Sequence, residues 1–163
     1  MNSLIRNLFF PSSLLSVNFT KENLQEIKNK IRVCEKNNGI QLVFAYQTRR
    51  RLKEIFQNIS PRTLALRQFR RSNVWDTEEN NGILFYFLLA DKNFEIIPDK
   101  GIAKSISTER WQIISDEIEK LLKKLPLHEA VLQGIDLIAK EVTGVVYKVN
   151  NTKNELSDEP VKV

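Results

Sequence analysis

An unbroken apolar run, ILFYFLLA from Ile83 to Ala90, constrains the fold of this chain more than any other stretch. Turn-forming residues bound it on both sides, with Asn80-Asn81-Gly82 before it and Asp91-Lys92-Asn93 after it. A run of this length that is rich in β-forming residues is typical of a strand covered on both faces. A second apolar segment, from Phe94 to Asp99, follows the turn. The stretch therefore predicts a buried antiparallel β-hairpin.

The sequence on both sides of this hairpin predicts one further strand and several helices. The segment from Ile40 to Thr48 is nearly continuous in apolar residues and predicts another internal strand. Helices are expected after Thr20, over residues 49–58 and 60–71, from the polar residues 105–108, and after Pro126. In the helix over 49–58 we expect Leu52, Ile55 and Phe56 to face inward. Because strands this apolar need helices on both faces, the expected fold class is α/β, a three-layer α/β/α sandwich whose mixed central sheet contains the buried hairpin.

The length and composition of the chain fit one globular domain, with 163 residues of which 42% are hydrophobic and 28% are charged. We expect a lead-in segment at 1–19, the α/β domain at 20–146, and a disordered tail at 147–163, where apolar residues are few. An apolar patch at Leu8 to Phe10 is interrupted by Pro11 before it reaches signal-peptide length. No window reaches the roughly 18 apolar residues of a membrane span. We therefore expect a cytoplasmic protein without a membrane span, in which the patch packs on the domain or makes a peripheral membrane contact.

The net charge of +5 is divided into two neighbouring blocks of opposite sign. Residues 49–71 carry eight basic side chains and one acidic one, whereas residues 76–99 carry six acidic side chains and one basic one. The spacing of the arginines favours a basic helical face, with Arg67, Arg70 and Arg71 as candidate anion-binding residues. Two solvated surfaces that differ in sign are the other interpretation.

Two residue types that occur once each exclude several kinds of site. Cys34 is the only cysteine, so neither an intramolecular disulfide nor a cysteine metal cluster can form. His128 is the only histidine, which excludes a metal site built on several histidines. The chain also lacks the glycine-rich loops that bind nucleotide phosphates. No organic cofactor is therefore expected.

Oxygen-bearing side chains gather at one end of the predicted hairpin. Asp76, Glu78, Glu79 and Asn80 lie just before the first strand, and antiparallel pairing returns Asp99 to the same end. Hard cations such as Ca²⁺ and Mg²⁺ take several carboxylate and carbonyl oxygens as ligands. These five residues are therefore candidate metal ligands, although their spacing does not match an EF-hand. A solvated acidic turn is the alternative.

The block WDTEENNGILFYFLLADKNFEIIPDKGI, residues 75–102, and the helix after it resemble the TPM domain, a family named after a thylakoid lumen protein, a photosystem-associated protein and a nematode channel modulator. The resemblance is closest to the small bacterial members and covers about residues 24–142. It implies a three-layer α/β/α domain with a phosphatase-like or divalent-ion-binding function, often in quality control or assembly of membrane complexes. Many members carry Asp-Asn-Gly where this chain has Asn80-Asn81-Gly82. A ligand at position 80 would therefore be an amide oxygen, with the carboxylates of the turn supplying charge.

Three functions are consistent with these residues. The leading hypothesis is a non-catalytic or weakly catalytic TPM-like domain that binds a divalent cation at the acidic turn and recognises a protein partner. The first alternative is metal-assisted hydrolysis of phosphomonoesters, with Asp76 or Asp99 as base or ligand and Arg71 neutralising the phosphoryl oxygens. The second alternative is binding of an anionic partner through residues 49–71. Nucleic acid is not favoured as that partner, because the segment has few aromatic residues for stacking on bases.

Overall fold

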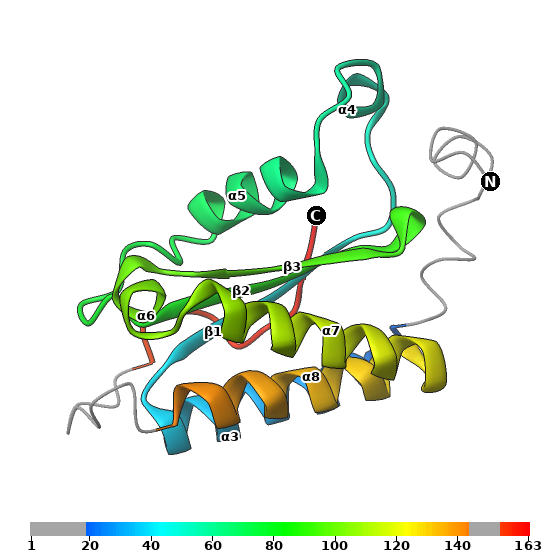
Figure 1. Cartoon of the computed structure of the whole chain (residues 1–163). Helices are drawn as coiled ribbons and strands as arrows, with labels where there is room; N and C mark the ends of the chain where they lie inside the picture. The colour runs from blue at the N-terminus through cyan, green and yellow to red at the C-terminus, as the bar shows by residue number, and fades with distance from the viewer. Residues whose placement is uncertain (1–18, 144–153) are drawn as a thin grey trace.

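A computed structural model describes residues 19–143 and 154–163 of the chain. A four-stranded sheet lies between two layers of helices, which makes the domain a three-layer α/β/α sandwich (Figure 1). Its strands are β1 (Gln41–Gln47), β2 (Gly82–Leu88), β3 (Asn93–Pro98) and β4 (Val161–Lys162), in the order β3-β2-β1-β4. The fold class predicted from the sequence is therefore confirmed.

The predicted hairpin consists of β2 and β3, joined by the short 3₁₀ helix η1 (Leu89–Asp91). These two strands are antiparallel, with Ile83 opposite Pro98 and Leu88 opposite Asn93. The neighbouring pairs β1–β2 and β1–β4 are parallel, so the sheet is mixed. Every residue of β1 and β2 is buried, as their continuous apolar runs predicted, because helices cover both faces.

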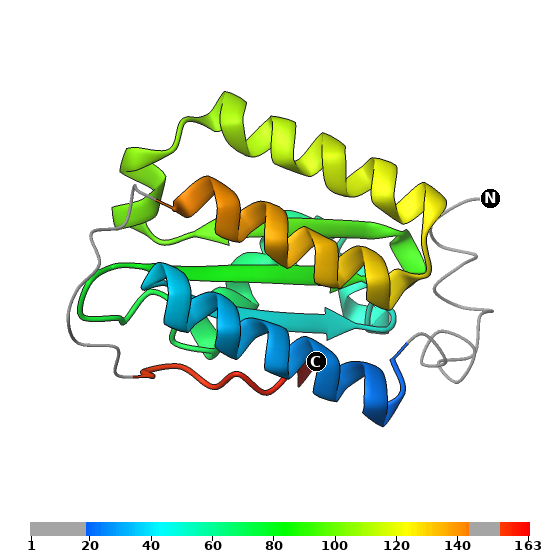
Figure 2. The same ribbon diagram turned by 90° about the horizontal axis from the view of Figure 1, so that it is seen from below.

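One face of the sheet carries α3 (Lys21–Asn38), α8 (Leu127–Val142) and α7 (Thr108–Lys124), which lie side by side with α8 in the middle (Figure 2). Alternate strand residues such as Phe44 and Phe85 pack against these three helices. The apolar stripe predicted for the last helix, Val131, Ile135, Ile138 and Val142, is fully buried there. Among the described residues, no helix combines the length and the apolar character needed to cross a membrane.

The opposite face carries α5 (Pro61–Arg71), which begins at the cap Ser60 with a proline in its first turn, as the sequence predicted. The other set of strand residues, such as Val43 and Leu84, packs against it.

A further short helix, α6 (Lys100–Ser105), follows β3 and is capped by Asp99. This helix was not predicted.

Helix α4 (Leu52–Phe56) is shorter than the helix predicted for residues 49–58 and projects away from the sheet (Figure 1). Its Leu52 is 59% exposed and its Phe56 is 85% exposed. The prediction that these two side chains face inward is therefore wrong. The physical reason is that α4 lies beyond the carboxyl ends of the strands, where no sheet face lies opposite it.

The last ten residues return to the sheet and contribute its edge strand β4. Val161 pairs with Ala45 of β1, and the N–H of Val163 donates to the carbonyl oxygen of Tyr46 at 3.0 Å. The prediction of a disordered tail is therefore wrong for residues 154–163. Backbone hydrogen bonds to β1 hold this segment in place, together with the packing of Leu156, Val161 and Val163 against the core.

The remaining tail residues 147–153 lie outside the described residues. The same holds for residues 1–18, which include the apolar patch Leu8 to Phe10.

Candidate functional site

The acidic turn between α5 and β2 is held by hydrogen bonds of its own backbone and of two buried side chains. Asn80, which has a positive φ of 51°, donates its N–H to the carbonyl oxygen of Thr77 at 3.1 Å. The hydroxyl of Thr77 accepts the N–H of Asn81 at 3.1 Å, and the side-chain amide of Asn81 donates to the carbonyl oxygen of Gly39 at 2.7 Å. These bonds anchor the turn to the end of α3.

Asp99 lies at the same end of the hairpin, as antiparallel pairing predicted. Its N–H donates to the carbonyl oxygen of Gly82 at 2.7 Å, and its Oδ1 accepts the N–H of Lys100 at 2.7 Å. The backbone then passes so close to the turn that a Cβ at Gly101 would lie 2.4 Å from the carbonyl oxygen of Asn80. The start of α6 and the acidic turn therefore form one packed unit.

Two oxygens in this unit are buried without a hydrogen-bond partner among residues 19–143 and 154–163. They are Oδ1 of Asn81 and Oδ2 of Asp99. The two residues are 7% and 6% exposed, respectively, and both are joined to Gly82, one through the chain and one through the hydrogen bond. Buried side-chain oxygens are nearly always satisfied in folded proteins, by protein groups or by ordered water, so each of these two oxygens indicates a place where a further group can bind.

The other predicted ligands are more exposed to solvent than Asp99. Asp76, Glu78 and Glu79 are exposed, and Asn80 is half-buried. Within the described ranges, no three Asp, Glu, His or Cys side chains are close enough together to form a metal site. A cation at this turn would therefore have to combine carboxylate oxygens with amide and backbone oxygens, which Ca²⁺ accepts readily.

Two residues at the turn were missed by sequence reasoning. Asn81, rather than Asn80, supplies the buried amide oxygen. Glu155, from the segment before β4, places its Oε2 3.0 Å from the N–H of Glu78 and so adds a carboxylate to the turn. The repeated Asn-Asn-Gly was the only local signal for Asn81, and nothing near Glu155 in the sequence pointed to its position.

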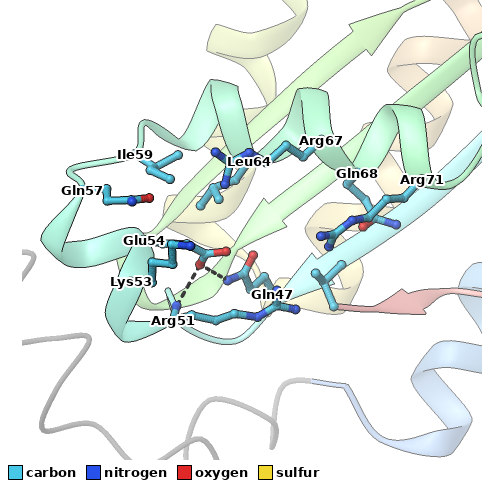
Figure 3. A pocket seen from close by; sticks show the side chains of 11 residues that line it. Gln47, Arg51, Lys53, Glu54, Gln57, Ile59, Leu64, Arg67, Gln68 and Arg71 are labelled. Atoms are coloured by element: carbon cyan, nitrogen blue, oxygen red, sulfur yellow. Dashed lines mark hydrogen bonds between the residues drawn. The ribbon is translucent and has the colours of Figure 1, made fainter.

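The predicted anion-binding residues lie elsewhere in the molecule. Arg67 and Arg71 line a pocket of about 250 Å³ between α4, α5 and the ends of β1 and β4, whereas the exposed Arg70 does not (Figure 3). The structure thus brings two of the three arginines together. The pocket includes neither Asp76 nor Asp99, so the arginine that the phosphatase hypothesis places beside these carboxylates faces a different cavity.

A buried hydrogen-bond network forms one wall of this pocket. The hydroxyl of Tyr86 donates to Oε1 of Gln47 at 2.7 Å, and Nε2 of Gln47 donates to Oε2 of Glu54 at 2.9 Å. Burial raises the pKa of Tyr86 well above its usual range, which keeps the hydroxyl protonated as a donor. Figure 3 shows Gln47 and Glu54 joined in this way, with Arg67 and Arg71 projecting from α5.

Comparisons with known proteins agree with this architecture. A family model described as the TPM domain matches residues 17–141. Among solved structures, the chain is similar to the NMR structure of the BA42 protein from the psychrophilic bacterium Bizionia argentinensis, with a TM-score of 0.77 and 23% identity over 89% of this chain and 95% of that one. At this identity the likeness shows the fold alone. The comparison with curated proteins found no match.

Proposed function

The chain belongs to the TPM domain family, and on this premise we propose that it binds a divalent cation, Ca²⁺ or Mg²⁺, at the acidic turn and acts through a protein partner without catalysing a reaction. The observation that carries the proposal is the pair of buried oxygens, Oδ1 of Asn81 and Oδ2 of Asp99, that lack a partner among the described residues. A hard cation would supply a partner to these oxygens, and water in a solvated turn is the alternative partner.

The residues around these oxygens suit such a ligand. Asp99 supplies a formal charge from a fixed position, because its other oxygen caps α6. Asn81 is fixed by its bond to Gly39. The surrounding carboxylates and amide would complete the coordination from the solvent side; they are Asp76, Glu78, Glu79, Asn80 and Glu155. The cation would neutralise their mutual repulsion and tie the turn to α6.

Trp75 supports a role in partner binding. It directly precedes the acidic turn and is 50% exposed. Exposed tryptophans are enriched at the centres of protein interfaces because they bury a large apolar surface. We propose that the cation orders the turn and that Trp75 then contacts the partner.

Phosphomonoester hydrolysis remains the alternative that the family resemblance suggests. It would need a positive group beside the phosphate and the carboxylates. Arg71 lines the pocket on the α5 face together with Gln47 and Val163, and neither Asp76 nor Asp99 lines that pocket. The role of Arg71 in neutralising the phosphoryl oxygens therefore does not agree with its position, which leaves cation binding without hydrolysis as our proposal.

Backbone amide shifts followed during a titration with CaCl₂, and separately with MgCl₂, test the cation proposal. We expect saturable shifts at residues 76–82 and at Asp99. Asp99→Asn removes the charge but keeps a good helix cap, so it should fold normally and bind at least about tenfold more weakly. Asp116→Asn, which changes an exposed carboxylate on α7, should bind like the wild type. Shifts that are absent at the turn, or equal affinities of all three proteins, would refute the proposal.

Capture of binding proteins on the immobilised chain tests the partner proposal. A genuine partner should be retained by the wild type in calcium and lost both with Trp75→Ala and on calcium removal. If Trp75→Ala retains the same proteins as the wild type, Trp75 is not the contact.

A further inference from the structure

Four basic side chains of the pocket between α4 and α5 have no carboxylate partner within the part of the chain that the structure describes. They are Arg51, Lys53, Arg67 and Arg71. Other arginines do form such pairs, for example Arg50 with Asp91 and Arg110 with Glu141. Unpaired cations that face one cavity create a positive potential there, which attracts anions.

Among the described residues that line the pocket, Glu54 has the only carboxylate side chain, and it is already engaged. Its Oε2 accepts hydrogen bonds from Nε2 of Gln47 at 2.9 Å and from the N–H of Arg51 at 2.8 Å. Glu54 and Gln47 are both buried, so these bonds hold the wall of the pocket in place and do not neutralise the basic side chains at its opening. Four cationic side chains against one carboxylate side chain give the lining side chains a formal excess of three positive charges.

The position of the pocket in the sheet also favours a ligand. Gln47 is the last residue of β1, and Val163 directly follows β4, which is parallel to β1. In open α/β sheets, ligands bind outside the carboxyl ends of parallel strands. This end of the sheet is opposite to the acidic turn, which precedes the amino end of β2, so the two sites are separate.

We propose that this pocket binds a phosphoryl group, carried either by a small soluble phosphate or by a phospholipid headgroup. Guanidinium groups match phosphate oxygens in bidentate geometry, and the charge of a phosphoryl dianion requires more than one of them. Arg67 and Arg71 are four residues apart, so they project from the same side of α5. With a volume of about 250 Å³, the pocket fits a compact group of this kind rather than a larger ligand.

The organic part of the ligand would contact the apolar lining, which includes Ile59 and Leu64. A phospholipid source would use one further feature of α4. Leu52 and Phe56 are exposed on this projecting helix, which also supplies Lys53 to the pocket (Figure 3). Apolar side chains beside basic ones are what a membrane surface with anionic lipids binds.

The first experiment titrates the full chain with inorganic pyrophosphate and follows the side-chain amide of Gln47 and the Arg N–H signals by NMR. We expect saturable binding that Arg67→Ala and Arg71→Ala each weaken at least about tenfold. Arg70→Ala is the matched control, because Arg70 is exposed on the same helix but does not line the pocket. It should change the affinity less than about twofold. Equal losses in all three variants would show a diffuse basic surface and overturn the proposal.

The second experiment separates the two sources of the phosphoryl group. The wild type, Arg71→Ala and Phe56→Ala are sedimented with vesicles of phosphatidylcholine, with and without phosphatidic acid. A headgroup ligand predicts binding only to vesicles with phosphatidic acid, reduced by both substitutions. A soluble ligand predicts pyrophosphate binding without sedimentation. If the wild type binds neither pyrophosphate nor vesicles, or binds vesicles equally well after Arg71→Ala, the proposal fails. Unchanged amide spectra of the variants outside the pocket would show that they remain folded.

Discussion

The backbone N–H of Asp99 donates a hydrogen bond of 2.7 Å to the carbonyl oxygen of Gly82. This bond extends the β2–β3 ladder by one pair beyond Ile83 and Pro98. It places the carboxylate that caps α6 beside the turn that begins β2. The candidate cation site is therefore attached to the end of the β2–β3 ladder rather than to a free loop.

Gly101→Ala should disturb this site through a clash with the backbone of the acidic turn. The new Cβ would lie 2.4 Å from the carbonyl oxygen of Asn80, so α6 and the turn would have to move apart. We expect a loss of about 1–3 kcal/mol in the free energy of unfolding, measured by chemical denaturation, together with weaker calcium binding. Lys100→Ala, at an exposed position of the same helix, should change neither quantity appreciably. Normal calcium affinity in Gly101→Ala would show that the site does not depend on this contact.

Asp91→Asn should destabilise the opposite end of the hairpin. Asp91 forms a buried ion pair with Arg50, which also donates to the carbonyl oxygen of Ile59 at 2.9 Å. Removing one partner leaves a buried charge uncompensated, so the free energy of unfolding should fall by about 3 kcal/mol. The exposed control Asp116→Asn should change it by less than about 0.5 kcal/mol. Urea denaturation of both variants provides the comparison, and equal effects would contradict this account of the pair.

Glu35 should make the stability depend on pH. Burial, and secondarily the neighbouring carboxylate of Asp158, raise the pKa of Glu35 from 4.5 to about 8. The folded state therefore keeps a proton that the unfolded state loses, and the stabilisation present below pH 4.5 is lost as the pH rises towards 8.

Glu35→Gln removes this titration. It can still accept the N–H of Leu42, which Oε1 of Glu35 accepts at 2.7 Å. We expect the variant to exceed the wild type in free energy of unfolding by about 1–3 kcal/mol at pH 9, with a smaller difference at pH 4. Glu26→Gln, exposed on the same helix, is the control. A difference that does not grow with pH would mean that Glu35 is charged in the folded state.

Gln41→Ala should loosen the segment that precedes β4. Oε1 of Gln41 accepts the N–H groups of Glu155 and Leu156 at 2.9 and 3.0 Å. Without this acceptor, we expect faster amide hydrogen exchange at both residues and at Val163, and a loss of about 1–2 kcal/mol in stability. Exchange in α8 should change only as far as global stability does. Unchanged exchange at Glu155 would show that β4 alone holds the segment.

The apolar pattern of the strands was sufficient to predict the fold class. The run from Ile83 to Ala90 has no charged side chain and only one polar group, the hydroxyl of Tyr86, which requires cover on both faces and leads to the three-layer arrangement. The same reasoning failed for Leu52 and Phe56, because helical spacing predicts which residues share a face but not whether anything lies opposite that face. It also failed for β4, since two residues in a polar segment carry no periodic signal.

For the candidate sites too, the sequence predicts features that depend on neighbouring residues but not those that depend on distant segments of the chain. The approach of Asp99 to the acidic turn follows from the antiparallel hairpin and could be predicted. The contributions of Glu155 and of Gln41 could not, because they depend on where the last segment of the chain returns. Likewise, the spacing of Arg67 and Arg71 predicts a shared helix face, but their meeting with Gln47 depends on the path of the connection between β1 and α5.

A crystal structure determined with excess calcium tests the central proposal most directly. The proposal predicts an ion bound by Oδ2 of Asp99 and Oδ1 of Asn81, with further oxygens from the acidic turn. The ion–oxygen distances should be about 2.4 Å, as is typical of Ca²⁺. An ion bound elsewhere, or these two oxygens satisfied by water alone, would contradict it.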